Sequence, residues 1–274
     1  MSRSRVGAAP ILAGLAGASV AAASYRLLLR HPPGGAQRWS RRNFRGTEVS
    51  LLAGPALAAG LVAGSAVAGG RSGCATAIGV GGAAAFGLLD DLHGGTHARG
   101  FRGHLRALGR GEVTSGLVKL VGIGATGLVA GLVIEPRPRD AAVTGALVAG
   151  TANLVNLLDL RPGRALKAVL VVAVPTLVGT GAAPAAAVAG AAAALLPEDL
   201  GERAMLGDTG ANAAGAALGT ALAAAARPGA RRTLLLGVVA LTAASERVSF
   251  TAVIDATPVL RTIDRLGRRR DGQP

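Results

Sequence analysis

Aromatic residues, cysteine and histidine are all scarce in this chain, and each scarcity excludes a class of function. Phe, Trp and Tyr make up 2% of the 274 residues, although the formal net charge is +14. The basic residues lie between apolar runs, so anionic lipid headgroups and an anionic substrate are expected as partners, and nucleic acid is not. A single cysteine, Cys74, cannot form a disulfide within the chain, and no cluster of histidines or cysteines indicates a zinc site.

Long apolar runs dominate what is present. Half of the residues are hydrophobic, and the mean hydropathy is +0.46. Such a chain is too apolar for a soluble domain and too long for one spanning helix. We therefore predict an all-α polytopic membrane protein with about nine transmembrane helices, as one multi-span domain over residues 1–256 with a basic, frayed cytoplasmic tail at 257–274. The predicted spans are 6–25, 49–70, 72–89, 113–134, 141–158, 165 to about 179, 184–196, 209–226 and 233–254, the last interrupted by Glu246 and Arg247.

Residues 168–197 are uncharged and are compatible with one long helix or with two short ones. We favour two, because Gly179, Gly181 and Pro184 cluster in the middle of the stretch, where they break helices. Lys167 can extend its side chain toward the headgroups, so the first of the two helices can begin near Ala165.

The positions of lysine and arginine predict the orientation. Alternate loops carry most of these residues, and the positive-inside rule places such loops in the cytoplasm. The N-terminus is then outside and the C-terminus inside, in a multi-pass protein of the plasma membrane. Arg227, Arg231 and Arg232 fall on the outer side and are the weakest point of this topology.

Two adjacent carboxylates, Asp90 and Asp91, end an uncharged run that begins at Ser72. Neighbouring carboxylates at the end of a spanning helix repel each other and are costly to desolvate, so a cation or a phosphoryl substrate is expected to compensate them. The alternative is a solvated loop that simply ends the helix. The predicted topology places further polar residues at the same face, and we expect the active-site cleft there. These residues are Asn153, Asn156, Asp159 and Asp208.

Asn153, Asn156 and Asp159 are spaced by three residues, so they can share one helical face and point into one cleft. The alternative for the two asparagines is hydrogen bonding between helices. Asp208 precedes an apolar run in a turn flanked by glycines, and the start of that helix offers backbone N–H groups to phosphate. Thr209 can instead cap the helix. Four carboxylates at one face favour Mg²⁺, which binds through a few carboxylates together with substrate phosphates.

Three motifs resemble, in the same order, those of the polyprenyl-phosphate N-acetylhexosamine-1-phosphate transferases. They are Gly87-Leu-Leu-Asp-Asp-Leu92, Asn153-Leu-Val-Asn-Leu-Leu-Asp159 and Leu206-Gly-Asp-Thr-Gly210. The family includes the phospho-MurNAc-pentapeptide translocase and the GlcNAc-1-phosphate transferases of wall polymer synthesis. The resemblance implies transfer of a sugar 1-phosphate from a UDP-sugar to a polyprenyl phosphate, with Mg²⁺ and release of UMP, in cell-envelope synthesis.

The resemblance also implies roles for single residues. Asp208 and one of Asp90 or Asp91 hold Mg²⁺, and the other assists the lipid phosphate; we predict Asp208 and Asp91 as the metal ligands and all three as catalytic. Asn153, Asn156 and Asp159 are predicted to bind substrate. The depth of Lys119 in the fourth span points separately to substrate binding, through contact with the lipid phosphate or with a carboxylate of the site. The alternative is that its side chain extends to the headgroups, for which this depth is poor.

The chain departs from the family after Asp159. The family continues with a second carboxylate, whereas here Leu160-Arg-Pro-Gly163 follows and Pro162 takes that position. Pro162 restricts Arg161, so Arg161 and Arg164 are expected at the cleft mouth, where Arg161 binds an anionic substrate. The alternative is that Arg161 lies at the membrane surface and serves only the positive-inside rule.

Two other functions remain open. One is a catalytically altered or inactive relative that binds polyprenyl phosphate or a partner in wall synthesis. The other is a small transporter whose path contains Lys119, Glu246 and Arg247, although carboxylates gathered at one face are not typical of a midmembrane site. A homodimer is compatible with all three functions.

Overall fold

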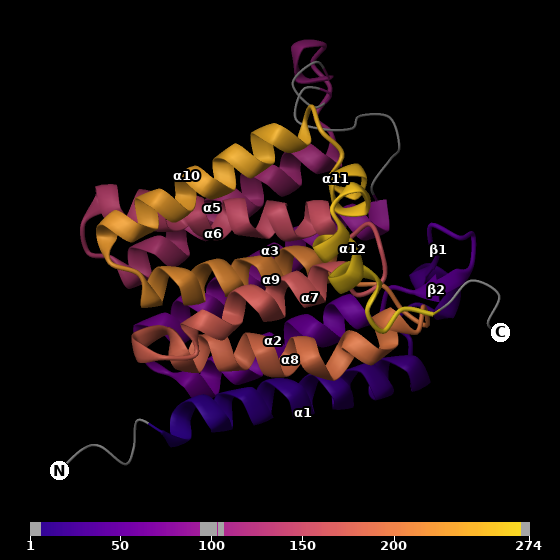
Figure 1. Cartoon of the computed structure of the whole chain (residues 1–274), viewed down its shortest axis with the longest axis horizontal. Helices are drawn as coiled ribbons and strands as arrows, with labels where there is room; N and C mark the ends of the chain where they lie inside the picture. Colours follow the sequence, from indigo (N-terminus) through magenta and orange to yellow (C-terminus); the bar gives the residue numbers. More distant parts are fainter. Residues whose placement is uncertain (1–6, 94–102, 104–106, 270–274) are drawn as a thin grey trace.

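The computed structural model describes residues 7–93, 103 and 107–269. It is a bundle of long helices that run back and forth along one axis (Figure 1). A two-stranded hairpin and two short helices lie together at one end of the bundle. The helices are α1 (Ala8–Arg30), α2 (Ala53–Ala68), α3 (Gly70–His93), α5 (Ser115–Ile134), α6 (Pro138–Leu158), α7 (Arg164–Ala173), α8 (Ala182–Leu200), α9 (Gly207–Ala225), α10 (Pro228–Ser245), α11 (Phe250–Ala256) and α12 (Pro258–Arg265), and the strands are β1 (Ser40–Arg42) and β2 (Glu48–Ser50).

Several of these helices can cross a membrane. Within the described residues five are long and apolar enough, and a sixth span results if α10 and α11 are counted together despite the 95° bend between them. The chain is thus an α-helical multi-pass membrane protein. The described helices that pass this test are fewer than the nine predicted spans. Helices α2 and α7 are too short, and α9 is long enough, at 19 residues, but not apolar enough.

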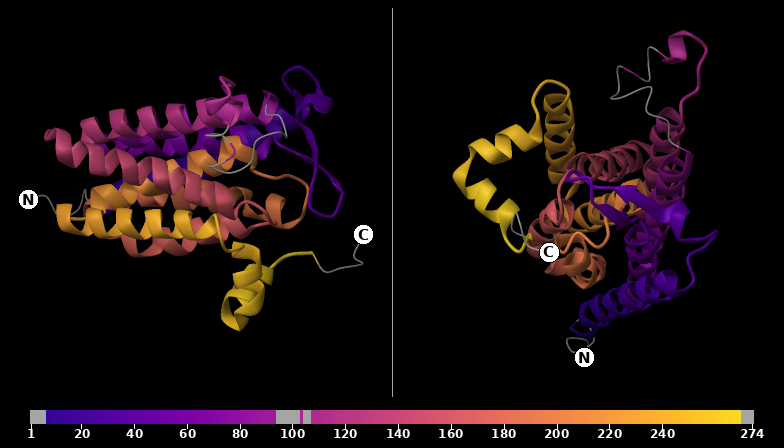
Figure 2. Two further views of the ribbon diagram at one scale, coloured as in Figure 1. Left: turned by 90° about the horizontal axis from the view of Figure 1, so that it is seen from above. Right: turned by 90° about the vertical axis from the view of Figure 1, so that its right-hand side faces the viewer.

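Helix α9 forms the centre of the bundle and packs against α3 and α6, and also against α2 and α8 (Figure 2). Almost every one of its residues is buried, and most are alanine or glycine. Small residues let helix backbones approach closely where lipid supplies no hydrophobic driving force between helices. A Cβ atom at Gly215 would lie 2.5 Å from the Cα atom of Ala152 in α6, so only glycine permits this contact.

The uncharged stretch 168–197 forms two helices, as predicted. Helix α7 ends at Ala173, two short 3-10 turns follow, and α8 begins at Ala182. Pro175 lies in the first of these turns, and a proline in that position cannot extend the hydrogen bonding of an α-helix. The predicted interruption of the last span is also confirmed, because α10 ends at Ser245, directly before Glu246 and Arg247.

The predicted start of the second span is wrong. Residues 48–50 are strand β2, which pairs antiparallel with β1, with Arg41 opposite Val49. Ser50 also exchanges backbone hydrogen bonds with the loop after α8, accepting from Met205 N–H at 2.9 Å. These bonds use the backbone groups in a sheet, so α2 begins only at Ala53.

The chain passes through one end of the bundle in the segments 31–52, 159–163, 201–206 and 246–269, and we call it the motif end. At the opposite end lie the arginines that the topology left unexplained. Arg231 is buried, forms an ion pair with Glu135 and donates to the backbone oxygen of Ala223, and Arg232 lies 3.5 Å from Asp140. Because two of the three arginines pair with carboxylates there, they add little net positive charge at that end.

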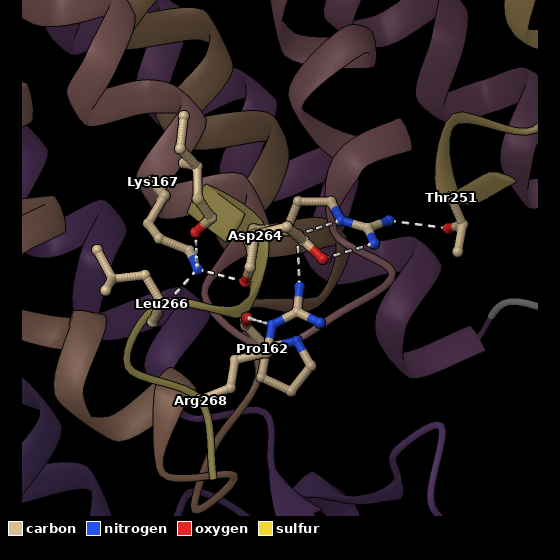
Figure 3. A network of polar contacts seen from close by, with 8 residues as sticks. Pro162, Lys167, Thr251, Asp264, Leu266 and Arg268 are labelled. Atoms are coloured by element: carbon tan, nitrogen blue, oxygen red, sulfur yellow. Dashed lines mark hydrogen bonds and ion pairs between the residues drawn. The ribbon is translucent and has the colours of Figure 1, made fainter. Parts of the chain in front are cut away.

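The C-terminal segment is not frayed over the part that the structure describes. Helices α11 and α12 fold against the start of α7, and Asp264 and Arg164 form a buried ion pair at 2.8 Å (Figure 3). The expectation of a loose tail is therefore wrong through residue 269. Charged residues of this segment, which its basic composition suggested would be solvated, form a buried ion pair and hydrogen bonds with the start of α7.

Candidate functional site

Lys119 is the centre of the candidate site. Its ammonium group lies between two carboxylates, at 2.7 Å from Oδ2 of Asp90 and in direct contact with Oδ2 of Asp208. The three residues come from α5, α3 and α9, and each side chain is mostly buried. The predicted contact between Lys119 and a carboxylate of the site is confirmed. One lysine between two carboxylates leaves a net negative charge at this point of the motif end.

Asp91 faces the start of α9. Its carboxylate accepts the backbone N–H groups of Asp208 at 2.9 Å and Thr209 at 2.8 Å, and the hydroxyl of Thr209 at 2.6 Å. The first N–H groups of a helix lack partners within it, so a carboxylate there acts as a cap and also interacts favourably with the helix dipole. Asp91 therefore fixes the position of Asp208, and Thr209 donates to this carboxylate instead of capping the helix itself.

Asp159 lies next to the same helix start, after the end of α6, and is half-buried. Burial and the nearby carboxylates of Asp199, Asp208 and Asp91 raise the pKa of Asp159 well above its usual range. Asp199, at the end of α8, is buried, and within the described residues its Oδ2 atom has no hydrogen-bond partner. The motif end thus concentrates five aspartates around the start of α9, where Lys119 supplies a compensating charge.

A large cavity, the lysine cavity, opens beside this cluster between α5, α6 and α10. It has a volume of about 990 Å³. Lys119, Asn153 and Asn212 lie on its polar wall, and Leu235, Val238 and Val239 are among its apolar residues. Glu246 and Arg247 also line it, so the three residues of the transporter hypothesis share one cavity. The charged residues of its lining are two cations, Lys119 and Arg247, and one carboxylate, Glu246. With this excess of one cation and its apolar body, the cavity suits a lipid with a phosphate head.

A smaller cavity, the loop cavity, has a volume of about 250 Å³, and two aspartates of the acidic cluster around the start of α9 line it. Its charged residues are Arg42, Asp159, Arg161, Asp199 and Glu202, and Phe44 and Pro162 lie beside them. The guanidinium of Arg161 stacks over the ring of Phe44 at 4.2 Å from the centroid. Arg161 is therefore held by Phe44 at the loop cavity that Asp159 also lines. Arg164, which was predicted at the same cleft mouth, is instead buried in the ion pair with Asp264.

The predicted substrate-binding residues do not all meet in one cleft. Asn153 faces the lysine cavity and Asp159 faces the loop cavity, whereas Asn156 belongs to the described lining of neither. Asp159 lies just beyond the end of α6 at Leu158. Its N–H donates to the backbone oxygen of Asn156, three residues earlier, so the last turn is tighter than the α-helical turn on which a shared face depends. The expectation of one shared face is thus wrong for Asp159.

The donor set fits Mg²⁺ in part. In the part of the chain that the structure describes, no three histidine, cysteine or carboxylate side chains are arranged to hold a metal ion. Mg²⁺ typically needs only one or two carboxylates when substrate phosphates complete its shell, and Asp208 and Asp90 offer hard oxygen ligands of this kind. Asp91 already accepts three hydrogen bonds from the start of α9, so its predicted part in metal binding has no support in the geometry.

Sequence reasoning missed several residues of the site. Asp199 lies just after the seventh predicted span, whose end the predicted topology places at the same face as Asp91, Asp159 and Asp208. The topology could therefore have identified it. Asn212 lies one turn after Asp208, and its side-chain amide donates to the backbone oxygen of Asp208 at 2.7 Å. Phe44 carries no signal in the sequence, because its partner Arg161 is far along the chain.

Comparison with known proteins adds no family assignment. The chain matches no protein-family model, and a search of curated proteins returns no match.

Proposed function

We propose that the chain transfers a sugar 1-phosphate from a UDP-sugar to a polyprenyl phosphate in the plasma membrane, with its motif end at the cytoplasmic face. The single observation that carries this proposal is the position of Lys119. Its ammonium is held by Asp90 and Asp208 and at the same time lines a largely apolar cavity of about 990 Å³. A lipid phosphate in that cavity would place its charge at Lys119 and its chain along α10.

The two cavities support a proposal in which each of the two substrates binds in its own cavity. The lysine cavity suits the lipid acceptor. The loop cavity, with Arg161 and Phe44 and a volume of about 250 Å³, suits one end of the nucleotide donor, and the rest of the donor would extend out of its mouth. Between them lies the start of α9, whose N–H groups are held by Asp91. In this arrangement the acceptor and the diphosphate of the donor meet at Asp208.

In the proposed reaction an oxygen of the lipid phosphate attacks the phosphorus that carries the sugar. The bond from this phosphorus to the oxygen of UMP breaks, so a lipid-linked sugar diphosphate and free UMP result. Phosphoryl transfer depends mainly on positioning and on neutralising charge. Lys119 positions the acceptor phosphate, and Asp90 and Asp208 hold Lys119. Mg²⁺, held by Asp208 and Asp90 when bound, would supply positive charge against the diphosphate.

The test is release of UMP by the purified protein, incubated with undecaprenyl phosphate, Mg²⁺ and a panel of UDP-sugars. We expect UMP from at least one donor, dependent on the lipid. Binding of polyprenyl phosphate without UMP from any donor would instead establish the alternative, a catalytically inactive relative. If the protein neither releases UMP nor binds the lipid, the proposal fails.

A bulky residue in the lysine cavity should weaken acceptor binding. Val239 lines this cavity, whereas Leu236, on the same helix, is 69% exposed and does not belong to its described lining. Val239→Trp is expected to raise the KM for undecaprenyl phosphate about tenfold, because the indole occupies the space of the lipid chain. Leu236→Trp should leave it unchanged. Equal effects of the two substitutions in a UMP-release assay would exclude this cavity as the acceptor site.

A further inference from the structure

A third cavity, the arginine cavity, lies at the motif end between the β1–β2 hairpin, the loop after α6 and helix α12. Its volume is about 960 Å³. Six arginines line it, whereas Asp255 is the one carboxylate in its described lining. The arginines come from three segments far apart in the sequence. They are Arg45, Arg161, Arg164, Arg265, Arg268 and Arg269.

The C-terminal segment builds one wall of this cavity. Arg164 donates to both carboxylate oxygens of Asp264, at 2.8 and 3.2 Å, and to the hydroxyl of Thr251 at 2.8 Å (Figure 3). Arg268 contacts the same carboxylate at 2.5 Å and donates to the backbone oxygen of Pro162 at 2.9 Å. One carboxylate therefore serves two guanidinium groups, so this wall keeps a positive charge. Burial and the neighbouring cations Arg164 and Arg161 lower the pKa of Arg268, as expected in a positive field.

The opposite wall brings two further cations together on one ring. The guanidinium carbons of Arg161 and Arg45 lie 4.2 and 5.1 Å from the centroid of Phe44. Arg45 also pairs with Glu202 at 3.0 Å. Within the described residues, no carboxylate pairs with Arg161 or with Arg265. Planar guanidinium groups that are held by stacking are well prepared to bind phosphate oxygens in pairs.

We propose that the arginine cavity binds a ligand with at least two phosphate groups, at a site separate from the Lys119 cluster. One phosphate can bind at Arg161 and Arg265, and a second can bind at the positive charge that Arg164 and Arg268 share around Asp264. The lysine cavity has no described lining residue in common with the arginine cavity. The loop cavity shares Phe44 and Arg161 with it, so a ligand here also contacts the residues next to Asp159. The phosphates can belong to a soluble molecule or to the headgroup of an anionic lipid.

The test uses inorganic pyrophosphate as the probe and the full chain in phosphatidylcholine nanodiscs, with EDTA and without UDP-sugar. We expect saturable binding that weakens with salt. Arg265→Gln, an exposed position on α12, should weaken it about tenfold, and so should Arg161→Gln, since each removes a charge-assisted contact. Arg203→Gln is the matched control, because Arg203 is an exposed arginine at the same end that pairs with Glu198 at 2.7 Å. It should not change pyrophosphate binding.

Two further measurements show whether the phosphates belong to a lipid or to a soluble molecule, and whether the probe binds in the arginine cavity or at the acidic cluster. If an anionic lipid is the occupant, nanodiscs with cardiolipin, which carries two phosphate groups, will suppress pyrophosphate binding in the wild type. Native mass spectrometry will then show bound cardiolipin that Arg265→Gln does not retain. If the ligand is soluble, both nanodiscs will give the same affinity. Binding that is lost in Asp208→Asn but kept in Arg265→Gln would place the probe at the acidic cluster and overturn the proposal. No binding of either probe would overturn it as well, whether or not the protein releases UMP.

Discussion

Replacing Asp208 by Asn is expected to lower the rate of UMP release on the order of 100-fold or more while the bundle stays folded. The Asp208 carboxylate is one of two that hold the Lys119 ammonium. The amide has nearly the same volume but no charge, so Lys119 would be drawn toward Asp90 and the acceptor phosphate would lose its position. If Asp208 also holds Mg²⁺, the loss of a metal ligand acts in the same direction.

The matched control for this prediction is Asp140→Asn. Asp140 lies at the opposite end of the bundle and pairs with the exposed Arg232 at 3.5 Å. Surface pairs of this kind contribute about 1 kcal/mol or less, so UMP release and folding should both stay normal. Normal turnover in Asp208→Asn, with the polyprenyl acceptor and Mg²⁺ present, would rule out the Lys119 cluster as the reaction centre.

Lys119→Met provides a second arm of the same experiment. It keeps a long apolar side chain in the lysine cavity but removes the cation between Asp90 and Asp208. We expect a larger loss of UMP release than in Asp208→Asn. The double variant Lys119→Met/Asp208→Asn should be no less active than Lys119→Met alone, because the two side chains act together on the acceptor phosphate. If the losses multiplied, the two residues would act separately.

The sequence predicted the gathering of acidic residues at one end of the bundle for a physical reason. Each crossing reverses the direction of the chain, so residues at the ends of alternate spans meet at one face. Asp90, Asp159 and Asp208 follow this rule, and the break in residues 168–197 preserves it. Had that stretch been a single helix, Asp208 would lie at the other end. The contact of Lys119 with a carboxylate follows from the cost of an uncompensated charge within a span.

The roles of individual carboxylates were not predictable in the same way. Whether a carboxylate caps a helix or faces a cation depends on the direction of its side chain. Asp90 accepts a hydrogen bond from Lys119, whereas Asp91, the next residue, caps the start of α9. The hairpin of β1 and β2 was missed because short strands of mixed polarity have no periodic signal. The docking of α12 was missed because the sequence offers many arginines, and nothing in it selects Arg164 as the partner of Asp264.

Replacing Asp264 by Ala is expected to release α11 and α12 from the loop after α6. The Asp264 and Arg164 side chains are each 5% exposed, and removing one partner of a buried ion pair typically costs about 3–5 kcal/mol. The loss here includes the contact with Arg268 and leaves Arg164, Lys167 and Arg268 as neighbouring cations. Hydrogen exchange of residues 257–269 should therefore rise strongly. Glu198→Gln, which removes the exposed pair with Arg203, should leave the exchange unchanged.

The same ion pair predicts a response to pH. Burial alone would raise the pKa of Asp264, but the hydrogen bond from Arg164 and the charge of Arg268 outweigh it and hold the pKa below 3.8. A carboxyl group whose pKa is lower in the folded state stabilises that state above its unfolded pKa and loses this effect as the pH falls through the folded value. Protection of residues 257–269, taken relative to the intrinsic exchange rate at each pH, should thus stay high near neutral pH and fall only below pH 3.8. In Asp264→Ala it should be low at neutral pH already, and equal protection of the two proteins near neutral pH would show that the helices dock without this pair.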